Sequence, residues 1–218
     1  MDRVGIDIKD IDEASFNKKR SQQAKSAIAK GKTGERSIVE LLKKHSGLFW
    51  CRIPSSGARV GSSNRDKISM MSENQIDAFL GDIFPPLELK YRWIIESKNY
   101  ATFPFKKFEK FIQGHDEIPA QLDGWINEFQ YDTETYLMSK YKREPFSFLF
   151  MKITDKGQWI VGNATHFSHM YPNIQYPPGT KTFNKKPSDI LIQRDYGMTW
   201  FFADAKKFVA LNEKILFI

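Results

Sequence analysis

The sequence predicts an α/β protein with a mixed central sheet that is flanked by helices. Along the chain, one helix pattern is followed by three short strand patterns, two further helix patterns and another strand pattern. This order of elements is typical of layered α/β domains. Hydrophobic residues make up 41% of the 218 residues and charged residues 27%, so the composition is that of a folded chain rather than a disordered one.

The first clear helix pattern follows a polar, lysine-rich segment, which we interpret as a basic N-terminal arm over residues 1–30. We expect Thr33 to cap the helix, apolar residues such as Leu42 to share one face, and Gly47 to end it. The arm has a weaker helical stripe of its own. It could therefore lie on DNA, contact a second subunit or remain a solvated helix.

Three strand patterns come next, each short and apolar. Residues 54–75, which are rich in glycine, serine and basic side chains, are expected to form a loop between the first two of them. Two prolines at 85–86 separate the second strand from the third. The predicted strands are 49–53, a broken run over 76–80 and 82–84, and 93–98.

The second half of the chain begins with two helix patterns, at 105–112 and from 119 to about 140. A strand at 146–153 is expected to form a hairpin with 158–161, across the turn residues 155–157. The stretch 166–187 reads as irregular, and an apolar run at 198–203 precedes a short helix at about 204–210. We therefore divide the chain into the arm, a core at 31–153 and a C-terminal extension at 154–218 that packs on the core.

Charge and cysteine content narrow the classes of function. The net charge of +7 and the pI of about 9.3 favour polyanionic partners, nucleic acid first and an anionic membrane second, although many soluble proteins are mildly basic without such a partner. One cysteine, Cys51, cannot form a disulfide framework or a zinc cluster within the chain, which fits a reducing compartment. The first 20 residues lack an apolar signal segment, and no apolar run approaches the roughly 18 residues of a membrane span. We therefore expect a cytoplasmic protein.

Acidic and basic side chains converge at the predicted sheet edge. Glu96 and Lys98 lie two residues apart on one strand, so both project from the same face, and pairing with the preceding strand would bring Asp82 beside them. Two carboxylates with the Ser97 carbonyl are ligands that Mg²⁺ prefers, and a lysine can orient or deprotonate water or offset charge on phosphate. Glu35, on the first helix, is placed to supply a third acid.

The spacing alone leaves another interpretation open. Glu96 and Lys98 could form an exposed ion pair on one strand face, which contributes little to stability. Glu88-Leu89-Lys90 has the same pattern, but it follows two prolines in a segment that reads as a loop. Glu96 instead ends an apolar strand, as expected for a site at a sheet edge.

Four sequence blocks in order resemble the PD-(D/E)xK nuclease superfamily, and within it the Holliday-junction-resolvase-like endonucleases of the archaeal and bacteriophage type. The resemblance covers roughly residues 30–153 and implies a restriction-endonuclease-like core. One departure is Gly81, which replaces the proline that precedes the aspartate. The blocks are Gly31-Lys32-Thr33-Gly34-Glu35-Arg36, Arg52-Ile53-Pro54-Ser55-Ser56-Gly57-Ala58, Gly81-Asp82-Ile83 and Ile95-Glu96-Ser97-Lys98-Asn99.

The resemblance implies a Mg²⁺-dependent endonuclease in which Mn²⁺ can substitute. Glu35 corresponds to the helix acid of the superfamily, Asp82 to the aspartate of its first half-motif, and Glu96 and Lys98 to its Glu-x-Lys pair. For the resolvase branch it also implies a homodimer that cuts two strands of branched DNA, as in recombination and repair. A restriction- or repair-type nuclease on duplex or nicked DNA, and a non-catalytic nucleic-acid-binding module, remain alternatives.

Contacts to the DNA backbone are expected from basic and hydroxyl side chains around the predicted site. Most of them lie in the glycine- and serine-rich loop, and two lie on the helix after the third strand, where a solvated lysine face is an equally good interpretation. Such contacts would be independent of base sequence and sensitive to salt. The candidates are Arg52, Ser55, Ser56, Arg59, Arg65, Lys67, Lys106 and Lys107.

Overall fold

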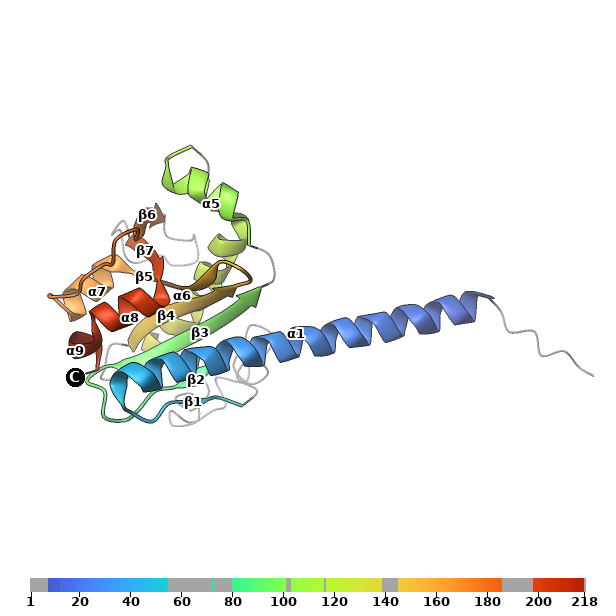
Figure 1. Ribbon diagram of the computed structural model, residues 1–218, viewed down its shortest axis with the longest axis horizontal. Helices are drawn as coiled ribbons and strands as arrows, with labels where there is room; N and C mark the ends of the chain where they lie inside the picture. Colours follow the sequence, from blue (N-terminus) through green and yellow to red (C-terminus); the bar gives the residue numbers. More distant parts are fainter. Residues whose placement is uncertain are drawn as a thin grey trace, which may run out of the picture.

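A five-stranded mixed sheet forms the centre of the protein in the computed structural model (Figure 1). The order of its strands is β3-β4-β5-β7-β6, so β3 lies at one edge. β3 (Arg92–Tyr100) and β4 (Pro145–Ile153) are parallel, whereas the other neighbours are antiparallel: β5 (Gly157–Asn163), β7 (Met198–Asp204) and β6 (Lys181–Lys185). The structure describes residues 8–54, 72, 80–100, 103–115, 117–138, 145–185 and 198–217.

Helices cover both faces of the sheet and divide the core into two apolar clusters. On one face, Trp93 and Ile95 of β3 pack with α1 (Ile8–Ser46), α7 (Ala164–Met170), α8 (Ala205–Leu211) and α9 (Glu213–Leu216). On the other face, Ile94 packs with α5 (Phe105–Ile112) and α6 (Ala120–Met138). Alternate residues of β3 therefore face opposite layers, as strand geometry requires. The predicted α/β class with a mixed, helix-flanked sheet is confirmed.

A short ribbon lies beside the free edge of β3. Its two strands, β1 (Cys51–Arg52) and β2 (Ile83–Phe84), are antiparallel, and β2 contacts β3. The predicted strands at 49–53 and 82–84 are thus present in shorter form. Most of the predicted loop at 54–75 and most of the predicted strand run at 76–80 lie outside the described part of the chain.

The helix expected to start at Thr33 is instead part of a single helix of 39 residues, α1. The Thr33 hydroxyl donates back to the Ala29 carbonyl at 2.9 Å and caps nothing, so that prediction is wrong. Residues 8–30 contain neither proline nor glycine, and the two glycines of α1, at 31 and 34, cost about 1 kcal/mol each, too little to break the helix. Figure 1 shows α1 beside β3 with its N-terminal half extending away from the other elements.

The predicted irregular stretch at 166–187 is also partly wrong, because it contains most of α7 and all of β6. The missed signal for α7 is Asn163, whose side chain accepts from the His166 amide at 3.0 Å as an N-cap. By contrast, the 146–153 hairpin forms as expected, with Ile153 opposite Gly157. No helix among the described residues is long and apolar enough to cross a membrane.

Candidate active site

The alternation of β3 determines where its polar residues project. Ile94 faces α6, so Glu96 and Lys98 face α6 as well, whereas Ser97 and Asn99 face α1. Two contacts agree with this assignment. Lys98 Nζ lies 2.9 Å from Glu128 Oε2 of α6, and the side-chain amide of Asn99 donates to the Lys30 carbonyl of α1. The predicted projection of Glu96 and Lys98 from one face of the sheet is therefore observed.

Asp82 is fixed against the free edge of β3 by backbone and side-chain hydrogen bonds. Its amide donates to the Ile95 carbonyl at 2.7 Å, and its Oδ2 accepts from the Ser97 amide at 2.8 Å. Its own carbonyl accepts from the Ile53 amide at 2.9 Å. The N–H and C=O of one strand residue point to the same side. The Ser97 carbonyl therefore also faces the edge that Asp82 occupies.

Gly81 explains why this chain departs from a proline-aspartate pair. Gly81 has a φ of +77°, which proline cannot adopt because its ring fixes φ near −65°. A Cβ at this position would also lie 2.8 Å from the Ile95 carbonyl oxygen and 3.0 Å from the Ile95 nitrogen. Glycine is thus required twice, for its conformation and for the close approach that brings Asp82 to β3.

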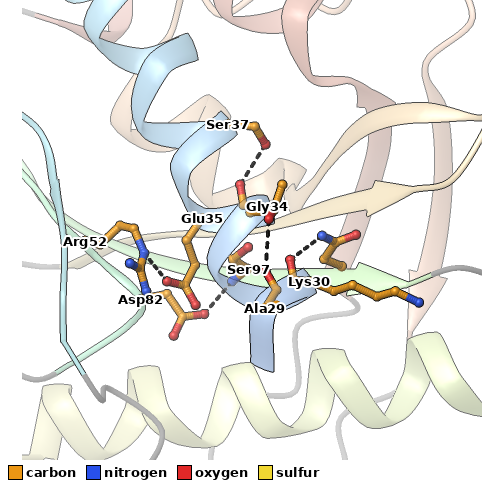
Figure 2. Close-up of polar contacts among 10 residues, drawn as sticks. Ala29, Lys30, Gly34, Glu35, Ser37, Arg52, Asp82 and Ser97 are labelled. Carbon is orange, nitrogen blue, oxygen red and sulfur yellow. Dashed lines mark hydrogen bonds and ion pairs between the residues drawn. The ribbon is translucent and has the colours of Figure 1, made fainter. Parts of the chain in front are cut away.

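Glu35 enters the site from the middle of α1, which packs closely on β3 at Gly34. A Cβ on Gly34 would lie 2.9 Å from the Cβ of Asn99, so the absence of a side chain allows this approach. The Glu35 carboxylate accepts from Arg52 Nε of β1. Figure 2 shows Glu35 of α1, Arg52 of β1 and Asp82, which directly precedes β2, converging, with Asp82 hydrogen-bonded to Ser97.

Glu128 is the site residue that sequence reasoning missed. It lies on α6, 30 residues after Lys98, and its Oε2 accepts a hydrogen bond from Lys98 Nζ at 2.9 Å. Glu96 Oε1 lies 3.4 Å from the same nitrogen. The acidic side chain at this point of a predicted helix gave no signal by itself. α6 lies between the parallel strands β3 and β4 in sequence and packs on the face of β3 from which Lys98 projects.

The charges of these side chains influence one another across the edge of β3. Burial raises the pKa of Glu35 above its usual value, and repulsion by Asp82 adds to the rise, whereas Arg52 and Lys32 oppose it. For Lys98, burial alone would lower the pKa, but the carboxylates of Glu96, Glu128 and Asp82 outweigh it and raise the pKa. Lys98 is therefore held as a cation, and Asp82 is electrostatically linked to both Glu35 and Lys98.

Three oxygen-bearing groups near this edge could hold a divalent cation such as Mg²⁺ or Mn²⁺. Asp82 and Glu96 supply carboxylates and Ser97 a carbonyl, all hard oxygen ligands. Within the described residues, no group of three or more His, Cys, Asp or Glu side chains is arranged to hold a metal ion. Mg²⁺ keeps several waters and commonly binds through only one or two carboxylates together with substrate phosphate, so two carboxylates and a carbonyl fit its needs.

A comparison with protein-family models identifies the family of this chain. Residues 26–175 match the model of a family described as "Phage putative PDDEXK endonuclease". The chain belongs to this family. The predicted PD-(D/E)xK superfamily and phage type are thereby confirmed, and family membership indicates a nuclease. No curated protein and no solved structure matches the chain.

The region shared with the phage PDDEXK endonuclease family contains every element around the candidate site, from the packed half of α1 through β3 and α6 to the β4–β5 hairpin. Strands β6 and β7 lie beyond it in sequence, yet they complete the same five-stranded sheet. The family region and the extent of the sheet therefore do not coincide.

The candidate DNA contacts are located as follows. Arg52 lies inside the site, against Glu35, and Lys106 and Lys107 are exposed on α5, which follows the end of β3. Five further candidates fall outside the described residues: Ser55, Ser56, Arg59, Arg65 and Lys67.

Proposed function

We propose that this protein is a Mg²⁺-dependent DNA endonuclease that cleaves phosphodiester bonds and selects branched DNA, in the manner of a Holliday junction resolvase. The observation that supports the chemistry most strongly is the position of Asp82. Its carboxylate is held on the Ser97 amide, in the strand segment that also carries Glu96 and Lys98, and it interacts electrostatically with Glu35.

In this proposal Asp82, Glu96 and the Ser97 carbonyl hold the metal ion. Mg²⁺, when bound, would supply positive charge to the phosphate under attack and lower the pKa of a water molecule in the site. Lys98, kept as a cation by its carboxylate neighbours, stabilises the negative charge that develops on the phosphate. Glu35, with its raised pKa, accepts a proton from water more readily than an ordinary carboxylate.

The preference for branched DNA rests on charge and on the kind of contacts that the chain offers. The net charge is +7, and the sequence contains no helix-turn-helix or zinc-finger pattern with which to read bases. The candidate contacts are basic and hydroxyl side chains, which bind phosphates regardless of sequence. Recognition of DNA shape fits these features better than recognition of a base sequence.

The same proposal predicts the oligomeric state and the cellular location of the protein. Symmetric cleavage of two strands requires two sites, so we propose that the protein acts as a homodimer, located where phage DNA is processed, in the host cytoplasm. Light scattering at micromolar concentration, with and without a four-way junction, tests the dimer. A mass equal to one chain under both conditions would contradict it.

A cleavage assay tests the substrate. The protein would be incubated with a synthetic four-way junction, a nicked duplex and a linear duplex of matched sequence, each with and without Mg²⁺. We expect the junction to be cleaved only when Mg²⁺ is present, and at least about 10-fold faster than either duplex. Equal cleavage of all three would support a restriction- or repair-type nuclease, and binding without cleavage of any would support a non-catalytic module.

A further inference from the structure

Lys98 lies between two carboxylates that approach it from different elements. Glu96 is its neighbour on β3, with 3.4 Å between Oε1 and Nζ, and Glu128 reaches it from α6 with 2.9 Å between Oε2 and Nζ. The Lys98 side chain is 16% exposed and that of Glu96 is 19% exposed, so both are partly buried. The closer of the two partners is the one that is remote in sequence.

The longer separation from Glu96 matters because the proposed chemistry requires two things of adjacent side chains. Glu96 has to bind a divalent cation, and Lys98 has to stay charged near the phosphate. An ammonium in tight contact with Glu96 would compete with the cation for the same oxygen atoms, because opposite charges attract strongly where water is scarce. Glu128 offers Lys98 a hydrogen-bonded anion in another direction, toward α6.

We propose that Glu128 is a positioning residue that draws the Lys98 ammonium toward α6 and thereby reduces its competition with a divalent cation for the Glu96 carboxylate. This inference rests on the proposed metal-dependent function. Glu128 acts through Lys98 and contacts neither metal nor substrate. An exposed ion pair on a helix would contribute little, but this pair fixes a mostly buried lysine beside a metal ligand.

Metal binding by the complete protein tests the inference without reference to cleavage. Mn²⁺ would be titrated by calorimetry into the wild type, Glu128→Gln, Lys98→Met and the double variant. We expect Glu128→Gln to weaken Mn²⁺ binding about 10-fold, because Lys98 then pairs with Glu96. In the Lys98→Met background the same change should alter the affinity by less than about 2-fold, because no ammonium is left to reposition.

Two further variants separate the effect from altered folding. Glu128→Asp retains the charge and should recover most of the lost affinity. Glu109→Gln removes an exposed carboxylate from α5 and should leave Mn²⁺ binding unchanged. In cleavage assays Glu128→Gln should raise the Mg²⁺ concentration for half-maximal rate about 10-fold, while saturating Mg²⁺ restores most of kcat. A merely structural role would lower kcat at every Mg²⁺ concentration.

Each failure has its own signature. Unchanged Mn²⁺ affinity in Glu128→Gln, in a wild type that binds Mn²⁺ and cleaves DNA, overturns the role of Glu128 and leaves the proposed function standing. An equal loss of affinity with and without Lys98 also overturns it, because Glu128 would then be a direct ligand. A wild type that binds no Mn²⁺ and cleaves no DNA overturns the proposed function together with the inference.

Discussion

On the α1 side of β3, Glu35, Arg52 and Asp82 come from three separate segments of the chain. On the α6 side, Glu96 and Lys98 come from β3 itself and only Glu128 is remote. The means of positioning differ as well. Asp82 is held by backbone amides and carbonyls, and the approach of its neighbours depends on Gly34 and Gly81. On the α6 side, a cation is held between the carboxylates of two side chains.

This difference indicates how each side should respond to change. Backbone packing is rigid and tolerates little added volume, so the α1 side should be sensitive to small steric changes at its glycines. The α6 side is maintained by charge and should be sensitive to substitutions that alter charge but keep shape. Because Asp82 contributes to the raised pKa of Lys98, the two sides belong to one electrostatic unit.

The largest effect should come from removing one proposed metal ligand on either side. Asp82→Asn and Glu96→Gln should each lower junction cleavage by on the order of 10³-fold and leave DNA binding nearly intact, because loss of a ligand also removes repulsion of phosphate. Cleavage kinetics and a binding titration measure the two properties. Glu88→Gln, at an exposed residue of the Glu88-Leu89-Lys90 sequence, is the matched control and should cleave normally. Wild-type cleavage by either ligand variant would remove that residue from the site.

A steric change on the α1 side should have the next largest effect. Gly81→Ala adds a Cβ against the Ile95 backbone at a φ of +77°, and we expect a loss of about 3 kcal/mol in the free energy of unfolding, with loss of cleavage. Urea denaturation measures the change. Gly114→Ala is the control, since Gly114 also has a positive φ, of +82°, but open space around it, and it should cost only about 1 kcal/mol. Equal losses would mean that the close approach to β3 is unimportant.

A smaller effect should follow from the contact between α1 and β3. Gly34→Ala raises helix propensity, but its Cβ would lie 2.9 Å from Asn99, so α1 must shift and carry Glu35 with it. We expect about 10-fold slower cleavage and a net destabilisation of about 1 kcal/mol. Gly124→Ala on α6, where nothing lies within 4 Å, should instead stabilise by up to about 1 kcal/mol and cleave normally. Stabilisation by both substitutions would show that a Cβ at position 34 fits between α1 and β3 without a shift of the helix.

The smallest effect should be a change in the pH dependence of cleavage. Arg52 opposes the rise in the pKa of Glu35, so Arg52→Gln should raise that pKa further, and the proton-accepting carboxylate form of Glu35 should be lost at a higher pH. Cleavage should fall about 10-fold at pH 6 but only about 3-fold at pH 8. Arg36→Gln, at an exposed position of α1 next to Glu35, should follow the wild-type pH profile. An equal loss at both pH values would assign Arg52 to DNA binding rather than to Glu35.

The α6 side was the more predictable from sequence. The two-residue spacing of Glu96 and Lys98 has one consequence in a strand, a shared face, and the apolar run before them indicated the strand. The α1 side was harder, because Glu35 was assigned to the first turn of a helix that begins far upstream, at Ile8. Glycine and threonine near residue 33 looked like a helix start, but the helical propensity of the preceding residues outweighed them.

By itself, the sequence determined the α/β class, the strand that carries Glu96 and Lys98, and the order of the four blocks that identify the superfamily. These depend on local periodicity and on residue identity. Tertiary structure alone decided that Glu128 reaches Lys98, that Arg52 faces Glu35 and that Gly81 adopts a positive φ against the Ile95 backbone. The physical reason is that such contacts join elements far apart in the chain, and their distances are set by how closely helices and strands pack, which local patterns do not encode.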